Sequence, residues 1–193
     1  MPFWTDTDTI NNPKRSFRFR VQFSNSGAFA EAENLKTTDF YWAKTAQKPS
    51  FTVGAAEHSY LNHTFKFPGR ITWSDVQITM VDPGGDEGVA YALAKLLSDS
   101  GYSVPQDSND LTTISKSKSV SGMGGSTAIK IIQLDDNGNA IEEWTLFNAF
   151  IVEANFGQLD YSSEELTEYS ITLKYDWAQL GNVEYRALSP AFS

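Results

Sequence analysis

The sequence predicts a mainly β protein: an antiparallel β-sandwich or barrel with one packed α-helix over about residues 86–99. Two observations carry this prediction. About seven segments alternate apolar and polar residues with the period of two that strands require, whereas a single segment, DEGVAYALAKLLSDSG, repeats its apolar residues at helical spacing. A parallel α/β sheet needs several crossover helices and is therefore excluded. At 193 residues the chain fits a single domain spanning residues 1–193.

The first strand is predicted in SFRFRVQF, which follows a loop marked by Asn11, Asn12 and Pro13. Apolar and polar side chains alternate along it, so they point to opposite sides of the strand. The apolar side holds Phe17, Phe19, Val21 and Phe23, and the polar side holds Arg18, Arg20 and Gln22. We expect Arg18 and Arg20 to point outward as a positive patch, and a subunit contact there is at least as plausible as a nucleic acid contact.

The next segments are extended and rich in aromatic residues. Pro68-Gly69 is a turn signal after an alternating run that begins near Leu61. Between Trp73 and Val76 the apolar residues move from odd to even positions. Because a strand has a period of two, this slip predicts a bulge or a change of buried face near Ser74 and Asp75.

The second half begins with the predicted helix, which Gly101 suits as a stop. Residues 105–127 are mostly Ser, Thr, Gly, Asn and Asp, so a long flexible surface loop is predicted there. Asp136-Asn137-Gly138 is a hairpin signal between two apolar runs. After Gly181 we expect only a short tail.

The last strand, ELTEYSITLKYDW, has the clearest alternation in the chain. One side should be buried and the other exposed. The predicted buried side is Tyr169, Ile171, Leu173, Tyr175 and Trp177, and the predicted polar side is Glu168, Ser170, Thr172, Lys174 and Asp176.

Composition restricts the possible functions. The absence of cysteine excludes disulfides, thiolate catalysis and zinc–thiolate sites. A net charge of −9 disfavours tight binding to nucleic acid phosphates. Residues 1–70 carry +3 and residues 71–193 carry −12, which is either an ordinary acidic surface or a pair of opposite faces that meet on self-assembly. No apolar run is long enough to span a bilayer, and the N-terminus lacks a signal-peptide pattern, so we expect a soluble, unexported chain.

Catalytic and metal-binding patterns are weak. His58 and His63 should lie on opposite faces of an extended segment, and neither Glu142-Glu143 nor Glu164-Glu165 is a natural dyad, since neighbours on a strand point apart. DDNGN lacks the later glutamate of a calcium loop. GMGGS lacks the Lys-Ser/Thr of a phosphate cradle. We therefore expect no enzyme activity, no cofactor and no metal.

Three stretches carry a family resemblance when taken in order. SFRFRVQF, KFPGRITWSDVQITMVD and EEWTLFNAFIVEANFGQLDYSSEELTEYSITLKYDW cover most of residues 14–180. Together they resemble the tail tube proteins of contractile-tailed bacteriophages, which are related to the tube proteins of type VI secretion and extracellular injection machines. This sequence departs from the shorter members of the family by two additions, residues 105–127 and the tail after Gly181.

The resemblance implies a subunit of hexameric rings that stack into a hollow tube for genome delivery. The implied partners are the subunit itself, the tail sheath, the baseplate and tape-measure proteins, and DNA that passes through the lumen without specific binding. The implied location is the virion tail, after synthesis in the host cytoplasm. A tube subunit of an injection machine and a baseplate protein that initiates the tube are alternatives.

By analogy with the family, the extended segment Phe51–Gly69 is the candidate arm that contacts a neighbouring subunit or ring. The candidate interface residues are Phe51, Tyr60, Phe65, Phe67, Arg18 and Arg20; Tyr60, Phe65 and Phe67 are alternatively ordinary core aromatics. The polar side of the last strand is the candidate lumen face, and an acidic surplus there would repel DNA phosphates. Trp4, Tyr41 and Trp42 are the only support for a competing carbohydrate-binding sandwich.

Overall fold

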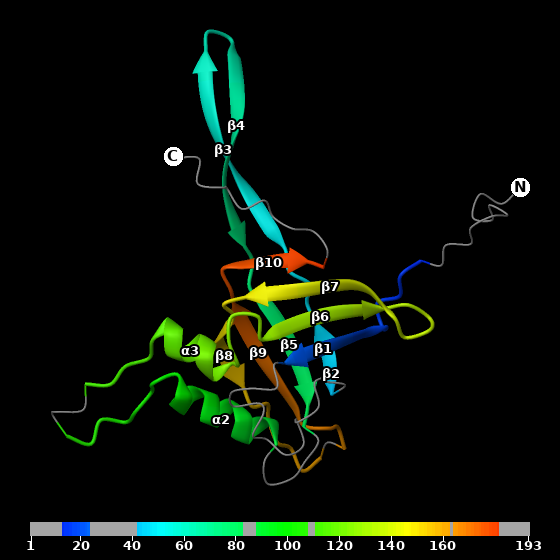
Figure 1. The fold of residues 1–193 in the computed structure, drawn as a ribbon, viewed down its shortest axis with the longest axis vertical. Coiled ribbons are helices and arrows are strands. Elements are labelled where there is room, and N and C mark those ends of the chain that lie inside the picture. Colours follow the sequence, from blue (N-terminus) through cyan, green and yellow to red (C-terminus); the bar gives the residue numbers. More distant parts are fainter. Residues whose placement is uncertain (1–12, 24–41, 83–87, 108–110, 163, 182–193) are drawn as a thin grey trace, which may run out of the picture.

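The computed structural model describes residues 13–23, 42–82, 88–107, 111–162 and 164–181. Two four-stranded antiparallel sheets pack face to face, and their strands cross at a steep angle (Figure 1). Sheet A has the order β1-β6-β7-β10, and sheet B has the order β2-β5-β9-β8. Sheet A comprises β1 (Phe19–Phe23), β6 (Ile129–Leu134), β7 (Ala140–Phe147) and β10 (Trp177–Leu180). Sheet B comprises β2 (Ala43–Ala46), β5 (Val76–Val81), β8 (Phe150–Asn155) and β9 (Glu168–Lys174).

Strand alternation places one side of each sheet in a shared core. Along β5 and β9 every second side chain is buried, and the two strands are in register, with Ile78 opposite Ile171. Sheet A contributes residues of the same kind, among them Val21 and Leu146, which are fully buried. The predicted antiparallel β architecture is therefore confirmed.

Two helices lie beside β8 at one side of the sandwich. The helix α2 (Val89–Asp99) packs against the shorter α3 (Lys116–Gly122), and α3 packs against β8. The expectation of one helix is therefore wrong, because α3 lies inside the stretch predicted as a flexible loop, residues 105–127. The side chain of Ser115 caps α3 by accepting a hydrogen bond from the Lys118 amide, a start signal that the Ser- and Gly-rich composition hid.

The helix α2 begins later than the sequence suggests. Gly88 has an extended backbone and stands just before the first helical residue. Val89, Ala92, Leu93 and Leu96 face the core. Ser100 ends the helix, and Gly101 follows with a φ of 94°, which agrees with the predicted stop.

The last strand is shorter than its alternation predicts. It ends at Lys174, and Trp177 begins β10 in the other sheet, where its ring stacks on Phe147 at 5.1 Å. Trp177 is 41% exposed, so its predicted burial is wrong. Tyr175 lies between the two strands and is half-buried.

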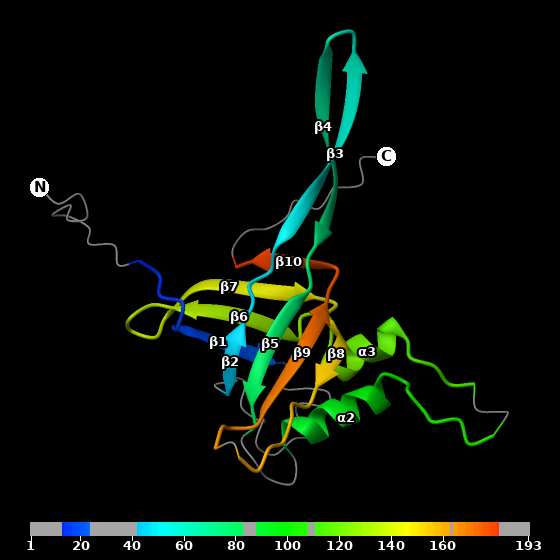
Figure 2. The ribbon, with the colours of Figure 1, turned by 180° about the vertical axis from the view of Figure 1, so that it is seen from behind.

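The strands β3 (Phe51–Tyr60) and β4 (His63–Trp73) form a separate two-stranded hairpin that projects far beyond the sandwich (Figures 1 and 2). We call residues Phe51–Trp73 the arm. Its turn lies at Leu61-Asn62, and β4 runs without a break through Pro68-Gly69. The turn predicted at Pro68-Gly69 is therefore wrong.

Candidate assembly surfaces

The arm is exposed along its whole length. Every residue of β3 and all of β4 except Trp73 are solvent-exposed. Strands of 10 and 11 residues make a ribbon of about 33 Å at roughly 3.3 Å per residue. A two-stranded hairpin with nothing packed on either side is marginally stable in water at best. The arm therefore has the form of an element that is completed by another molecule.

The outer half of the arm has one aromatic side and one polar side. On the polar side Lys66 forms an ion pair with Glu57 at 3.5 Å, and Ser59 and Thr64 hydrogen-bond at 3.1 Å. The cross-strand pairs on the other side bring together phenyl, phenol and imidazole rings. The His63 ring lies edge-on to the Phe65 ring, with 4.7 Å between the ring centroids. We call this side the aromatic face; it consists of Ala56, His58, Tyr60, His63, Phe65 and Phe67.

A bulge separates the two halves of the arm. The register between β3 and β4 shifts between Val53 and Ala55, so β4 carries one extra residue there. The backbones approach closely at this point, and a Cβ on Gly69 would lie 3.1 Å from the Gly54 carbonyl oxygen. Because one added residue reverses the side to which later side chains point, the apolar side of the inner half, with Val53 and Ile71, is opposite the aromatic face.

The arm is anchored to the sandwich by a group of aromatic rings. Trp73 contacts Phe51 at 5.3 Å and Tyr175 at 6.0 Å between ring centroids. The Tyr175 hydroxyl donates to the Ser74 carbonyl oxygen at 2.8 Å. Burial, with the nearby charge of Asp75, raises the pKa of Tyr175 to about 12, so this donor keeps its proton at any physiological pH. At Ser74 and Asp75, where the apolar residues change from odd to even positions, the chain leaves the arm and enters sheet B.

The outward side of sheet B is polar, and two of its charges, Lys44 and Glu168, pair with each other. Glu168, Ser170, Thr172 and Lys174 alternate along β9 with the buried residues, as the sequence predicts. Glu168 accepts a hydrogen bond from Lys44 of β2, and this bond raises the pKa of Lys44. Asp176 does not share this side, because β9 has ended; its carboxylate binds Lys116 of α3 at 2.6 Å and Asn148 at 2.8 Å.

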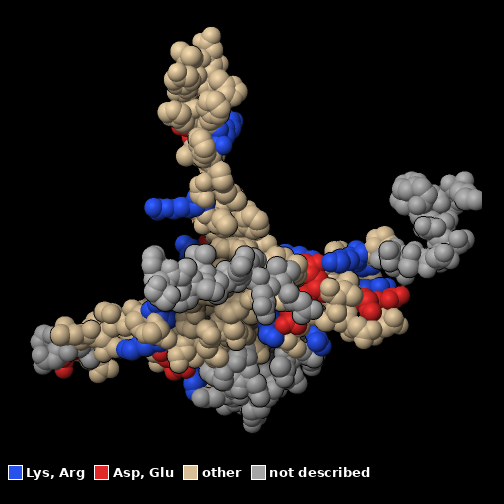
Figure 3. All heavy atoms as spheres, turned by 45° about the horizontal axis from the view of Figure 1, so that its top comes forward, with Lys and Arg blue, Asp and Glu red and all other residues tan. Residues whose placement is uncertain are grey.

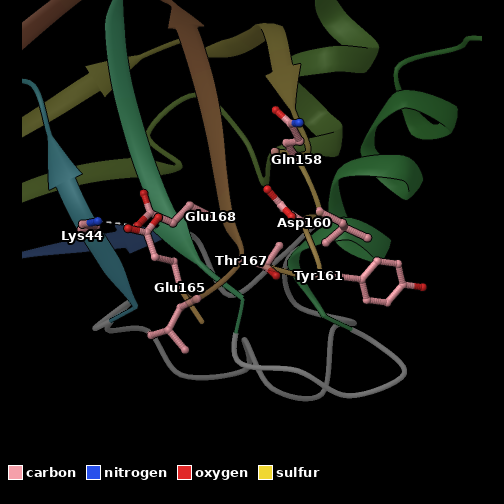
Figure 4. A pocket seen from close by; sticks show the side chains of 10 residues that line it. Lys44, Gln158, Asp160, Tyr161, Glu165, Thr167 and Glu168 are labelled. Atoms are coloured by element: carbon pink, nitrogen blue, oxygen red, sulfur yellow. Dashed lines mark hydrogen bonds and ion pairs between the residues drawn. The ribbon is translucent and has the colours of Figure 1, made fainter. Parts of the chain in front are cut away.

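The end of the sandwich opposite the arm carries a hollow of about 780 Å³. It lies under the connection from β8 to β9, of which we call residues 156–162 and 164–167 the distal loop. In Figure 4 Lys44 and Glu168 meet on one side of the hollow, and the ring of Tyr161 points away from it on the other. Leu159, Tyr161 and Leu166 are among the most exposed apolar side chains of the described residues.

A family model for the T4-like virus tail tube protein gp19 matches residues 15–179. The chain belongs to this tail tube family. Among solved structures, the anti-feeding prophage tube-terminating cap matches at 16% identity with a TM-score of 0.62, covering 95% of this chain and 100% of that chain. The sheath-tube complex of the extracellular contractile injection system PVC, in its extended state, matches at 17% identity with a TM-score of 0.61, covering 93% and 99%.

At these identities the solved structures show the fold alone. No curated protein sequence matches the chain. Family membership makes the chain a structural, non-enzymatic component of a tail or contractile tube assembly. The surfaces that matter in such a tail tube protein are those that meet other subunits.

The sequence-predicted interface residues of this tail tube protein fall into two groups. Phe51, Tyr60, Phe65 and Phe67 all lie on the arm and are about half exposed or more, so none of them is a core aromatic. Arg18 and Arg20 lie elsewhere, before and on β1, an edge strand of sheet A, and both are half-buried. The Arg18 guanidinium lies 5.5 Å from the Phe17 ring. Phe17 was predicted to share the apolar side of the first strand, but it precedes β1 and is 73% exposed, whereas Val21 and Phe23 are buried.

The two histidines and the Glu142-Glu143 pair lie on strands of this tail tube fold. Because the hairpin turn lies between His58 and His63, both are on the aromatic face, and their predicted opposite placement is wrong. Glu142 and Glu143 do point apart: Glu143 pairs with Lys130 at 2.8 Å, and Glu142 is mostly buried. Among the residues that the structure describes, no group of three or more His, Cys, Asp and Glu could hold a metal, and no helix is long and apolar enough to cross a bilayer.

Sequence reasoning missed the role of Glu142. It joins three separate segments, accepting hydrogen bonds from Lys14 at 2.5 Å, Lys48 at 2.7 Å and the Trp144 indole at 2.7 Å. Burial opposes its ionisation, but these three donors outweigh burial and lower the pKa of Glu142 to about 2. Lys48 also donates to Gln133 at 2.6 Å.

Trp42 packs partly buried against the core, so it offers no exposed ring for a sugar. The other two aromatics of the carbohydrate-binding alternative, Trp4 and Tyr41, and the predicted tail after Gly181 lie outside the described residues.

Proposed function

We propose that this protein is the subunit of a phage tail tube, in which hexameric rings stack into a hollow conduit for genome delivery. The observation that carries the proposal is the arm: an isolated ribbon with exposed apolar residues on both halves. Such a ribbon gains stability only by packing on a partner. In a tail tube family the partner with the greatest local concentration is another copy of the same chain.

Sheet B supplies the inner wall in this proposal. Its two edges, β2 and β8, are antiparallel to each other across four strands, so β8 of one copy can continue the antiparallel order beside β2 of the next. Repeated around a ring, the sheet closes and no edge is left. Glu168, Ser170, Thr172 and Lys174 then line the lumen, whereas Asp176 does not.

The proposed lumen lets DNA pass without binding it. Along sheet B the outward charged side chains are two cations, Lys44 and Lys174, and two carboxylates, Glu153 and Glu168. Between them lie hydroxyl and amide side chains such as Thr172 and Gln77. A balanced, polar wall gives phosphates neither a cationic site to bind nor a strong repulsion. The acidic surplus of residues 71–193 is thus not concentrated on this side.

The proposed partners outside the ring are the sheath around the tube, the baseplate at its start and a tape-measure protein within it. The location is the virion tail, reached after synthesis and assembly in the host cytoplasm. The matched solved chains come from a tube-terminating cap and a sheath-tube complex, which supports a position in direct contact with a sheath.

Electron microscopy of the purified protein over a concentration series tests this proposal. We expect six-fold rings at low concentration and hollow tubes of constant diameter at high concentration. A protein that remains monomeric at every concentration would contradict it. The tubes should not retain double-stranded DNA at physiological salt in a pelleting assay.

The main alternative is a tube protein of a bacterial contractile injection or type VI secretion machine, or a protein that initiates or ends a tube. The similarity to a cap and to a sheath/tube terminator favours it. A terminator forms single rings that do not stack on themselves and that stop the growth of tubes made by another protein. Open-ended growth from the pure protein argues for a tube subunit.

A further inference from the structure

An apolar hollow lies on one side of the sandwich, between α2, α3 and β8; we call it the groove. It holds about 470 Å³, and Glu153 is the only charged residue among those that line it. Leu97, Val152 and Phe156 also line the groove, and each of them is about half exposed. A hollow of this size with apolar walls is typical of a place that receives another apolar group.

A bulge in β8 forms part of the groove. The register between β8 and β9 shifts between Ile151 and Glu153, so Val152 is an extra residue on β8. Ile151 stands opposite the core residue Leu173, and Glu153 stands opposite Thr172 on the outward side of sheet B. A bulge redirects a side chain at the edge of a sheet. The edge strand therefore adds the apolar side chain of Val152 to the groove, with a carboxylate beside it.

The opposite side of the sandwich presents one large apolar side chain. Among the described residues that precede β3, Phe17 is the only large apolar residue that is exposed. It lies in a turn formed by Arg15–Arg18, which we call the Phe17 turn. The Arg15 carbonyl oxygen accepts hydrogen bonds from the Arg18 amide at 3.3 Å and from the side chain of Gln133 at 3.2 Å. Because Gln133 is buried, these bonds fix the Phe17 turn to the body of the sandwich.

The Phe17 turn and the groove lie on opposite sides of the subunit. Lys48, which follows β2, donates to Gln133 at 2.6 Å, so the turn that Gln133 holds lies beside the β2 edge of sheet B. The groove lies beside β8, the other edge of that sheet. In both ribbon views the start of β1 and the helix α3 are on opposite sides, at a similar height along the long axis (Figures 1 and 2). Copies placed side by side therefore bring the Phe17 turn of one against the groove of the next.

The two sides also carry complementary charges. Within the described part of the chain, neither the Arg18 guanidinium nor the Glu153 carboxylate forms an ion pair. By contrast, Lys14 and Lys48 are both paired with Glu142. In Figure 3 cationic and acidic side chains lie together where the described chain begins, next to the grey N-terminal residues. Arg18 and Glu153 can thus pair with each other when two copies meet.

We propose that Phe17 of one copy inserts into the groove of the neighbouring copy in the same ring, where Arg18 pairs with Glu153 of that copy. The inference rests on the proposed function and names the side chains that hold neighbours together within a ring. A buried aromatic side chain removes about 150–250 Å² of surface from water, and a preformed turn loses little conformational freedom on docking. The contact joins two different surfaces, so it is heterologous, and repetition around an axis closes it into a ring.

The aromatic face of the arm is the competing occupant of the groove, since it is also apolar and exposed. The arm projects from one end of the sandwich along the long axis, whereas α2, α3 and β8 lie at the side (Figures 1 and 2). A copy at the same height reaches the groove with its Phe17 turn. An arm reaches it only from a copy displaced along the axis. The experiment therefore has to separate these two occupants.

Disulfide cross-linking tests the contact directly, because the chain contains no native cysteine. The variant Phe17→Cys with Val152→Cys has one thiol on the Phe17 turn and one in the groove, both at exposed positions. The two thiols lie on opposite sides of a subunit, so a disulfide forms only between copies. We expect mild oxidation of the assembled full-length protein to give a ladder of covalent oligomers up to six subunits on a denaturing gel. Each single variant is a control and should give nothing larger than a dimer.

A second cysteine pair tests the competing occupant. Phe65→Cys with Val152→Cys has one thiol on the aromatic face of the arm and one in the groove, and we expect no ladder from it. The same gel, run with the same oxidant and protein concentration, compares the two pairs.

Exchange of the two charges tests the ion pair. Arg18→Glu alone and Glu153→Arg alone place like charges opposite each other. Each should raise the concentration for half-maximal ring assembly at least tenfold, as measured by light scattering after size-exclusion chromatography. The double variant, Arg18→Glu with Glu153→Arg, restores the pair with reversed polarity and should return to within about threefold of the wild-type value. A loss of stability in the separate subunits would not be repaired in this way.

The outcomes separate this docking from the proposed function. If the wild type forms rings but the Phe17 and Val152 pair gives no ladder, the docking is overturned and the proposed function stands. A ladder from the Phe65 pair in its place, or covalent dimers alone from the Phe17 pair, also overturns it. A double charge variant that stays as weak as the single variants overturns the ion pair. Wild-type protein that forms no rings at any concentration overturns the proposed function, and the docking with it.

Discussion

The sandwich and the arm use the same sequence pattern with opposite results. In β9, alternate residues such as Ile171 and Leu173 are fully buried between two sheets and α2. In the arm, the alternate residues Phe65 and Phe67 repeat the same spacing and stay half exposed. Alternation thus specifies that one side of a strand avoids water, but it does not specify which molecule covers that side.

This difference separates two sources of stability. A core residue stabilises the monomer because its partners are within the same chain. An arm residue has few partners in the monomer, so under the proposed function it contributes only when subunits meet. Substitutions of similar size should therefore have different effects in the two regions. In the core they should lower the free energy of unfolding, and on the arm they should raise the protein concentration required for assembly.

The largest effect on the monomer is expected at the centre of the core. Ile171→Ala removes three buried carbon atoms opposite Ile78 and should lower the free energy of unfolding by about 2–4 kcal/mol. Urea titration of the monomer, followed by tryptophan fluorescence, measures this loss. A change below about 1 kcal/mol would show that the two sheets do not share a tight core.

An intermediate effect is expected at Glu142, which joins the sandwich to segments outside it. Glu142→Gln should cost about 1–2 kcal/mol, because Lys14 and Lys48 lose a partly buried partner. The control Glu143→Gln removes only an exposed pair with Lys130 and should cost less than about 0.5 kcal/mol. Equal losses in the two variants would contradict the role of Glu142.

The same residue gives the monomer a pH dependence with a defined sign. The folded pKa of Glu142 is about 2, against an ordinary value of 4.5. A depressed carboxyl pKa contributes stability that is present above pH 4.5 and is lost as the pH falls toward 2. Urea midpoints between pH 6 and pH 2 should therefore fall less steeply in Glu142→Gln than in the wild type. Parallel curves would contradict this assignment.

A smaller effect is expected where α3 meets the connection between β9 and β10. Lys116→Ala breaks an exposed ion pair with Asp176 at 2.6 Å, and exposed pairs contribute about 0–1 kcal/mol. The bonds from Lys116 and Asn148 lower the pKa of Asp176. Double substitution with Asp176→Asn should add little to the single loss, since both changes remove the same interaction. Fully additive losses would argue against the pair.

The smallest effect on the monomer, and the largest on assembly, is expected on the arm. Phe67→Ala should change the free energy of unfolding by less than about 0.5 kcal/mol, because the ring is 54% exposed. The concentration at which tubes form, followed by light scattering, should rise at least tenfold. A loss of 2 kcal/mol in the monomer would show that the aromatic face is covered within the chain.

Much of the fold could be predicted because it depends on local pattern. The spacing of Val89, Leu93 and Leu96 predicted α2. The parity change at Ser74 and Asp75, predicted as a bulge or a change of buried face, lies where β4 ends and β5 begins. The alternation of β9 predicted the polar side up to Lys174. The extension of this strand to Asp176 and Trp177 was wrong. The chain bends after Lys174, but apolar residues continue at every second position into β10, so the sequence pattern does not reveal the bend.

The remaining features depend on contacts between distant residues. The helix α3 has no apolar stripe of its own and is held by α2 and β8, so composition predicted a loop. Pro68 and Gly69 carry a turn signal, yet they lie in a continuous strand, where Gly69 allows the close approach to Gly54. Glu142 accepts hydrogen bonds from Lys48 and Lys14, which are 94 and 128 positions away from it in the sequence. No short window of sequence contains these partners.

The arm stands at one end of the subunit only, and this has a consequence for how a tube is finished. In the proposed tube, subunits stacked in one direction would leave arms at one mouth and the opposite ends of the sandwich at the other. The two mouths would then differ in chemistry, so they would elongate at different rates and need different proteins to close them. A protein that stops one mouth would have to cover bare arms, and a protein that stops the other would have to cover the end of the sandwich that carries the distal loop.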